Sequence, residues 1–192
     1  MILPPIYLAS SSPRRSDLLR QIKVDFQVLR VSVDESIQVK ESAESYVKRV
    51  ASMKAEAGWQ ASLGDRLVLA ADTSVVIDGH VIGKPESDED ARRMLSMLSG
   101  RSHQVMTAVA VKNACAHQCL LQVNEVTFSS LSQEDMDWYV SSGEGRDKAG
   151  GYAVQGLAAV FIHRINGSYS GIMGLPLFET VQLLTQVNSG EQ

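Results

Sequence analysis

Hydrophobic and polar positions along this chain predict strands and helices that follow one another in mixed order. Short apolar or alternating stretches predict strands, and these cover residues 6–9, 24–28, 67–71, 75–77, 105–111, 120–128 and 158–165. Apolar positions at helical spacing predict helices, and these cover residues 13–22, 47–55, 88–98, 133–140 and 176–187. Asp78-Gly79 and Asn166-Gly167 add turn signals. The pattern therefore indicates an α/β fold with a mixed sheet.

Three of these helices have recognisable starts. Ser12 precedes Pro13, which is the order of an N-cap and a first helical residue. Ser87 and Ser132 are each followed three residues later by an aspartate, a capping-box pattern. The helix boundaries at these points are accordingly the best defined.

Composition limits the class of protein. The chain has 192 residues, of which 44% are hydrophobic and 21% charged, as in ordinary soluble globular proteins. No repeat or linker interrupts it, so we expect a single domain over residues 1–192. The net charge of −4 disfavours a general binder of nucleic acid or membranes, and a site for a polyanion must then be a local basic patch.

The cysteines and the first residues indicate a cytoplasmic protein. Cys115 and Cys119 flank a histidine, but a metal site would need a second ligand pair at comparable spacing, so we expect two reduced thiols. Residues 1–5 include two prolines and no basic residue, unlike a signal peptide. The best apolar run, residues 67–71, ends at Asp72 and is much shorter than the roughly 18 residues of a membrane span.

A serine-rich turn between a strand and a helix is a candidate phosphate site. Backbone N–H groups and the dipole at a helix start favour anions, and hydroxyl and guanidinium groups add donors. A first helical turn normally prefers acidic residues, so two arginines there favour a bound anion over an incidental surface cap. The predicted phosphate-binding residues are Ser10, Ser12, Arg14 and Arg15. The chain has no P-loop or dinucleotide-binding glycine pattern.

Two acidic positions are candidates for a metal site. Asp72 ends the most apolar predicted strand, and carboxylates at the carboxyl ends of strands face the ligand crevice of α/β folds. Asp34-Glu35 follows another predicted strand and would complete an oxygen-rich site for Mg²⁺ or Mn²⁺ if it met Asp72. The alternatives are a turn-capping role for Asp72 and a solvated surface pair at residues 34–35.

Several basic residues and one glutamine remain as candidates. Lys54 shares the apolar face of a predicted helix, where it either reaches a partner or extends to solvent. Lys84 lies in Gly83-Lys84-Pro85, while Arg146 and Lys148 lie in a glycine-rich stretch. Gln155 closes that stretch, and its amide can pair with the edge of a base.

These segments together resemble the Maf family of nucleoside triphosphate pyrophosphatases. The matching motifs are Leu8-Ala9-Ser10-x-Ser12-Pro13-Arg14-Arg15, Ala71-Asp72-Thr73-x-Val75, Gly83-Lys84-Pro85, Asp147-Lys148-Ala149-Gly150-x-Tyr152-x-Val154-Gln155-Gly156 and Asn166-Gly167-Ser168-Tyr169…Gly174-Leu175-Pro176. The resemblance implies a long mixed sheet in two lobes with a central cleft, similar to inosine-triphosphate pyrophosphatases. It also implies hydrolysis between the α and β phosphates with a divalent metal, Mg²⁺ or Mn²⁺.

The resemblance further implies roles for single residues. Asp72 matches the general base of the family, and Glu35 matches a second acidic residue that binds metal or water; both are candidate metal ligands. The residues that match the surroundings of the triphosphate are Ser10, Arg14, Arg15, Lys54 and Lys84. Lysine and arginine can neutralise the charge that grows on a leaving pyrophosphate.

Three positions imply the branch of the family that prefers dTTP and UTP. These are Arg14, Thr73 and Gln155. The expected function is therefore a dTTP/UTP pyrophosphatase that also acts on modified pyrimidine nucleotides. The alternatives are a 7-methyl-GTP pyrophosphatase and a nucleotide-binding regulator, associated with septum formation, with vestigial hydrolysis. The partner is then a nucleoside triphosphate, with no nucleic acid or membrane, and relatives often form homodimers.

Overall fold

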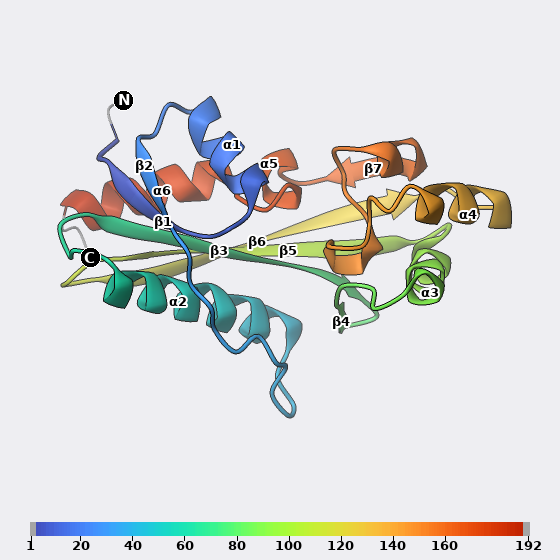
Figure 1. Ribbon diagram of the computed structural model, residues 1–192, viewed down its shortest axis with the longest axis horizontal. Coiled ribbons are helices and arrows are strands. Elements are labelled where there is room, and N and C mark those ends of the chain that lie inside the picture. The colour runs from blue at the N-terminus through green and yellow to red at the C-terminus, as the bar shows by residue number, and fades with distance from the viewer. Residues whose placement is uncertain (1–2, 190–192) are drawn as a thin grey trace. The chain divides into compact units, whose positions relative to one another are not determined.

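The computed structural model describes residues 3–189 and contains one seven-stranded sheet (Figure 1). The first two and last three residues of the expected domain, 1–192, lie outside the described residues. The strands are β1 (Ile6–Ala9), β2 (Phe26–Leu29), β3 (Leu67–Ile77), β4 (His80–Ile82), β5 (Ser102–Lys112), β6 (His117–Phe128) and β7 (Ile162–Asn166). The α-helices are α1 (Pro13–Gln21), α2 (Ala43–Ala61), α3 (Asp88–Leu98), α4 (Gln133–Ser141), α5 (Tyr169–Ile172) and α6 (Leu177–Ser189).

The sheet is mixed, as the sequence predicts. Its strand order is β2-β1-β3-β5-β6-β7, with β4 paired to β3 outside this path. β1 pairs in parallel with both β2 and β3, whereas β4 is antiparallel to β3 and β7 is antiparallel to β6. The α/β fold class with a mixed sheet flanked by helices is thus confirmed. None of the helices within residues 3–189 has the length and apolar character needed to cross a membrane.

The described chain divides into two compact units. Unit 1 comprises residues 3–72, 107–122 and 174–189, and unit 2 comprises residues 73–106 and 123–173. β3, β5 and β6 each contribute residues to both units.

In unit 1, helices cover both faces of the strands. Figure 1 shows α2 on one side and α1 and α6 on the other. β1 is buried along its whole length, and α2 approaches it at Gly58, where an added Cβ would lie 2.7 Å from Ala9 Cβ and 2.8 Å from Val68 Cγ1. A glycine inside a helix is normally unfavourable, but here it lets α2 pack directly onto β1 and β3.

In unit 2, α3 and a group of aromatic rings form the core. α3 buries Ala91, Met94, Leu95 and Leu98, the face that its apolar spacing predicts. His103, Phe128 and Tyr152 meet edge to face, with ring centroids 4.9–5.4 Å apart. The glycine-rich stretch enters this core at Gly150, whose φ is +69° and whose added Cβ would lie 2.9 Å from Val75.

The three predicted helix starts are at the expected residues, but only some of the expected capping hydrogen bonds form. Ser132 forms the complete capping box with Asp135, while Ser87 caps Asp90 N and Asp90 instead accepts from Glu86 N. Ser12 lies at the N-cap of α1, but its side chain makes no capping hydrogen bond.

Three expectations for secondary structure need correction, and one short helix was missed. The predicted strand 158–165 is a 3₁₀ helix, η2 (Leu157–Phe161), followed by the shorter β7, because Ala158 and Phe161 are buried while Leu157 and Val160 are exposed, a three-residue period. β2 has no fully buried face: its pattern is only partly buried and Val28 is 42% exposed. α2 runs from residue 43 to 61, well beyond 47–55. α5 was not predicted.

The buried His103 makes unit 2 sensitive to acid. His103 is 3% exposed and its Nε2 lies 2.7 Å from Tyr152 Oη. Burial lowers its pKa from 6.5 to about 4, so the unfolded chain binds a proton first as pH falls. We expect the effect of His103 on the free energy of unfolding to be constant above pH 6.5. As pH falls from 6.5 to 4, that free energy should decrease progressively, by about 3 kcal/mol in total.

Urea unfolding of the wild type and of His103→Gln across this pH range measures the effect. Glutamine is neutral, so the stability difference between the two proteins should change with pH by that amount. His163→Gln, an exposed histidine in the same unit, is the matched control and should leave the slope unchanged. An identical pH dependence in His103→Gln and wild type would contradict the prediction.

Candidate active site

The serine-rich turn after β1 leads directly into α1, as the sequence predicts. Ser10 is 7% exposed, and its Oγ accepts hydrogen bonds from Ser12 N at 3.2 Å and from Arg15 Nη1 at 3.2 Å. The first turn of α1 contains no acidic residue. Its N–H groups and dipole are therefore not opposed by a side-chain carboxylate of that turn, a feature that suits an anion.

The two arginines of this turn have different environments. Arg15 is fixed, since its Nε donates to Gly174 O at 2.8 Å. Burial lowers the pKa of Arg15, while the nearby carboxylates of Asp72 and Glu35 act against that shift. Arg14 is half-buried, and the structure records no hydrogen bond or ion pair between its side chain and any other residue in 3–189. Arg14 is thus the guanidinium available to a ligand, and Arg15 adds charge from a fixed position.

Lys54 joins the two acidic candidates. Its Nζ lies 2.8 Å from Asp72 Oδ1 and 2.8 Å from Glu35 Oε1. The side chains of Lys54 and Asp72 are 14% and 7% exposed, whereas that of Glu35 is 51% exposed. The alternative in which Lys54 extends to solvent is excluded, whereas Glu35 contacts Lys54 from an exposed position at the surface.

Asp72 occupies a different place in its strand from the one predicted. It lies in the interior of β3, which continues to Ile77, and not at a strand end. A carboxylate is costly within a buried strand, and the ion pair with Lys54 from α2 offsets that cost. The turn-capping alternative for Asp72 is therefore wrong, and so is the strand-end argument that favoured it as a ligand.

The two carboxylates have the chemistry of a partial metal site. One oxygen of each contacts Lys54, and no described residue hydrogen-bonds the other oxygen. Carboxylate oxygens suit a hard cation such as Mg²⁺ or Mn²⁺. Within the part of the chain that the structure describes, no three His, Cys, Asp or Glu side chains gather to hold a metal ion, so a cation on Glu35 and Asp72 would complete its shell with water or phosphate oxygens.

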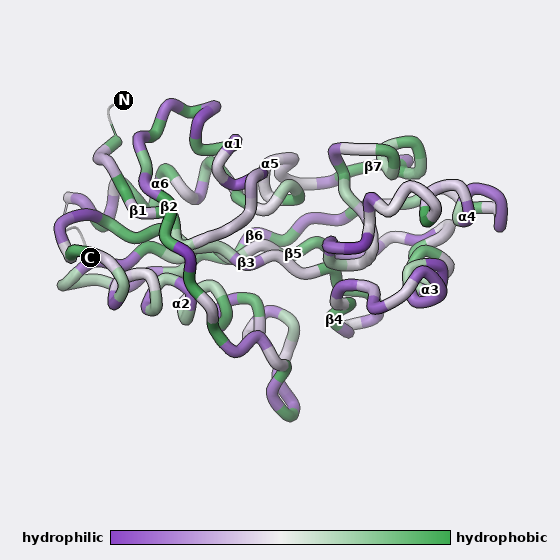
Figure 2. The backbone as a smooth tube through the Cα atoms, in the orientation of Figure 1, coloured by the Kyte–Doolittle hydropathy of each residue, from purple (hydrophilic) through white to green (hydrophobic). Residues whose placement is uncertain are grey.

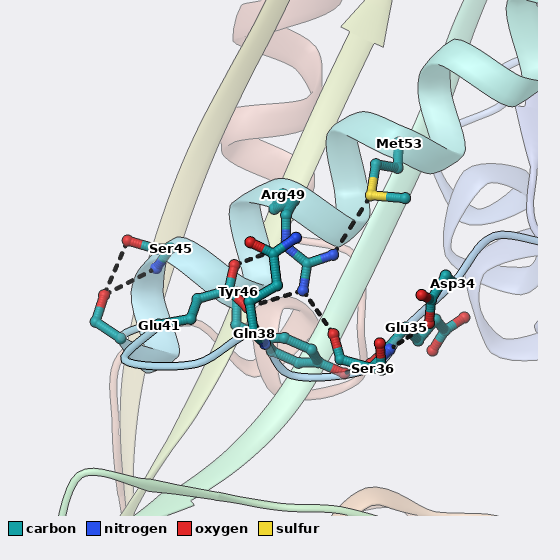
Figure 3. A network of polar contacts seen from close by, with 10 residues as sticks. Asp34, Glu35, Ser36, Gln38, Glu41, Ser45, Tyr46, Arg49 and Met53 are labelled. Atoms are coloured by element: carbon teal, nitrogen blue, oxygen red, sulfur yellow. Dashed lines mark hydrogen bonds and ion pairs between the residues drawn. The ribbon is translucent and has the colours of Figure 1, made fainter.

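Tyr46, which the sequence analysis did not single out, belongs to the same neighbourhood. Its hydroxyl donates to Glu35 O at 3.0 Å (Figure 3). Burial, with the carboxylates of Asp72 and Glu35, raises the pKa of Tyr46 to about 12. The phenol therefore stays a neutral hydrogen-bond donor. In the sequence, Tyr46 lies at helical spacing from Val50, which indicates only that it belongs to the buried face of the helix.

The remaining candidates lie in unit 2, where two motifs come together. Gly150 N donates to Gly83 O at 2.9 Å, so the Gly83-Lys84-Pro85 turn contacts the glycine-rich stretch. Lys84 and Gln155 are exposed, and Thr73 follows Asp72 in β3 and is half-buried. Arg146 pairs with Asp88, and Lys148 pairs with Asp147.

The cysteines are free thiols, with Cys115 exposed and Cys119 half-buried. Burial raises the pKa of Cys119. The raised pKa keeps the Cys119 thiol protonated at neutral pH.

Comparison with known proteins now identifies the family. The family model described as Maf-like protein matches residues 5–187. A dTTP/UTP pyrophosphatase of Pseudoalteromonas atlantica is 50% identical over 186 residues, covering 95% of this chain and 97% of its own. Proteins of the same name from Methylobacillus flagellatus and Chromobacterium violaceum are 51% and 47% identical, covering 93% and 94% of this chain and 90% and 93% of their own.

A solved structure shares the fold. The Staphylococcus aureus Ham1 protein superposes with a TM-score of 0.55 at 15% identity, covering 98% of this chain and 100% of its own. At that identity the likeness concerns the fold alone. The family match over nearly the whole chain and the identities near one half agree with the motifs, and the chain belongs to the Maf family.

Proposed function

We propose that this protein hydrolyses nucleoside triphosphates to the monophosphate and pyrophosphate, with dTTP, UTP and modified pyrimidine nucleotides as substrates. The observation that carries the proposal is the Asp72–Lys54–Glu35 contact, with distances of 2.8 Å on both sides of Lys54 Nζ. A general base, a charge-neutralising lysine and a second acidic ligand can together serve the hydrolysis of a phosphoanhydride. The names and identities of the curated relatives support the same reaction.

The triphosphate is bound at the start of α1. Ser10 and Ser12 supply hydroxyl and backbone donors, Arg14 offers an uncommitted guanidinium, and Arg15 adds buried positive charge. Anions are favoured at a helix N-terminus by N–H groups and the dipole. With the triphosphate bound there, a water molecule attacks its α phosphorus.

Asp72 accepts the proton of that water. The water oxygen forms a bond to the α phosphorus, the bond from that phosphorus to the bridging oxygen breaks, and pyrophosphate leaves with the electron pair. Lys54, and by its motif Lys84, neutralise the negative charge that grows on the phosphate oxygens. Glu35 holds the water or a metal ion through its free oxygen.

A divalent cation fits the donor set of Glu35 and Asp72. When bound, it supplies positive charge to the phosphate oxygens and lowers the pKa of a coordinated water. Without a bound cation, Lys54 holds the two carboxylates near each other, because each of them contacts its ammonium group.

Gln155 is assigned to base recognition, together with Arg14 and Thr73. A uracil or thymine edge presents a carbonyl acceptor beside an N–H donor, and one amide can satisfy both. In Gln155→Glu the donor is lost, and we expect kcat/KM for UTP to fall by about 10–100-fold. Gln133→Glu adds the same charge on the exposed surface of α4 and should leave kcat/KM within twofold of wild type. An unchanged preference for UTP over purine nucleotides in Gln155→Glu would remove this role.

A panel of nucleoside triphosphates with Mg²⁺ or Mn²⁺ tests the proposal. We expect UMP or dTMP with pyrophosphate and little product from purines. Preferred cleavage of 7-methyl-GTP would change the substrate class, and tight UTP binding by folded protein without turnover would indicate a regulatory nucleotide binder.

The setting follows from this reaction. Nucleoside triphosphates are abundant in the cytoplasm, which is the location that we propose. The chain acts in this proposal as one Maf-like domain over residues 1–192, and the homodimer stays a prediction.

A further inference from the structure

The loop that carries Glu35 has little structure of its own. Residues 30–38, between β2 and α2, form no helix or strand, and every side chain from 34 to 40 is exposed. In Figure 2 this loop passes through hydrophobic and hydrophilic residues in turn, and Ile37 and Val39 are 55% and 92% exposed. No hydrophobic core therefore fixes the loop, although its Glu35 carboxylate must keep a fixed position beside Asp72.

Arg49 on α2 fastens the loop at two points (Figure 3). Its guanidinium donates to both oxygens of Glu41, from Nε at 2.6 Å and from Nη2 at 2.8 Å, and Nη2 also donates to Ser36 O at 2.9 Å. The Glu41 side chain is only 7% exposed, and that of Arg49 is 20% exposed. A forked, largely buried pair of this kind has a defined geometry, unlike a surface ion pair.

Neighbouring contacts extend the attachment to Glu35 itself. Tyr46 donates to Glu35 O at 3.0 Å, and the Arg49 Cζ lies 5.6 Å from the centre of the Tyr46 ring. Two consecutive carbonyl groups, those of Glu35 and Ser36, are thus held by side chains of α2. Lys54 of the same helix holds the Glu35 carboxylate. Tyr46 and Arg49 can act together because residues three positions apart lie on adjacent parts of one helix surface. Lys54 lies further along α2 and reaches the side chain of the same loop residue.

We propose that Arg49 is a positioning residue for hydrolysis: by holding Ser36 O and Glu41 it fixes the backbone that follows Glu35, and so places the Glu35 carboxylate beside Asp72. The inference rests on the proposed function, in which Glu35 serves the reaction. Arg49 itself touches no substrate in this assignment and acts through Glu35.

A double-mutant cycle tests the proposal. In Arg49→Met the stem is kept and the guanidinium is lost, and we expect kcat/KM for UTP to fall by about 10-fold or more, with a higher Mg²⁺ concentration needed for half-maximal rate. In a Glu35→Gln background the same change should cost less than about twofold, because the group that Arg49 positions no longer acts. Arg49→Lys keeps the charge but not the fork and should recover part of the rate.

Amide hydrogen exchange gives a readout that does not depend on activity. Peptides covering residues 34–41 should exchange faster in Arg49→Met, while those of α6 should not. Arg20→Met is the matched control, since Arg20 forms an exposed pair with Asp17; it should change neither rate nor exchange in residues 34–41.

The possible failures are distinct. If Glu35→Gln lowers the rate and Arg49→Met lowers it by the same factor in both backgrounds, Arg49 is merely structural and the inference is overturned. Unchanged exchange in residues 34–41 overturns it as well. If Glu35→Gln keeps the full rate, the role of Glu35 in the proposed function fails, and the inference fails with it.

Discussion

Replacing Asp72 with asparagine is expected to lower the turnover of UTP by about 10²–10⁴-fold, the range for loss of a general base. Asp72 lies within β3 with 5% exposure, and its Oδ1 is 2.8 Å from Lys54 Nζ. Asparagine has nearly the same shape and can still accept a hydrogen bond from Lys54, but it cannot take a proton from water. Steady-state kinetics with thermal unfolding of the same sample measures the loss and shows that the variant is folded.

Asp25→Asn is the control for Asp72→Asn. Asp25 is an exposed aspartate immediately before β2, and its replacement removes the same charge from the surface. We expect its turnover to stay within twofold of wild type. Turnover above one-tenth of the wild-type value in folded Asp72→Asn would rule out Asp72 as the general base.

Replacing Lys54 with methionine is expected to affect both turnover and stability. The change leaves the carboxylates of Asp72 and Glu35 facing each other without the ammonium that contacts both. Turnover of UTP should fall by about 100-fold or more because charge on the phosphates is no longer neutralised. The free energy of unfolding should fall by about 3 kcal/mol, since removing one member of a buried ion pair leaves the other unpaired.

Lys48→Met is the control that shows whether the losses in Lys54→Met come from removing any lysine of α2. Lys48 is an exposed lysine on the same helix, so we expect wild-type kinetics and a change in unfolding free energy below about 0.5 kcal/mol. Urea unfolding and UTP kinetics on both variants provide the comparison. Equal behaviour of Lys54→Met and Lys48→Met would show that the contact seen at 2.8 Å has no part in the reaction.

Features set by neighbouring residues could be predicted from the sequence. Ser132 and Asp135 are three residues apart and form the complete capping box, and Asp78-Gly79 joins β3 to β4 as a turn. The stretch at residues 157–161 could not be separated from a strand, because a short apolar run has no period long enough to decide. The structure shows a 3₁₀ helix there, with Ala158 and Phe161 buried three positions apart.

The candidate site was predictable in its residue types but not in its contacts. The serines and arginines at the start of α1 are adjacent in the chain, and the structure places them together. Lys54 and Asp72 come from different elements, so their contact depends on how α2 packs on the strands at Gly58. Arg49 and Tyr46 contact a loop without periodic pattern, and no local signal distinguishes such residues from an ordinary helix surface.

Hydrolysis of UTP in ¹⁸O-labelled water tests the central claim most directly, because the label marks the phosphorus atom that water attacks. The account predicts one ¹⁸O atom in UMP and none in the pyrophosphate, as measured by mass spectrometry after a single turnover. Label in the pyrophosphate with unlabelled UMP, or UDP with labelled phosphate, would contradict attack at the α phosphorus and the reaction assigned to Asp72, Lys54 and Glu35.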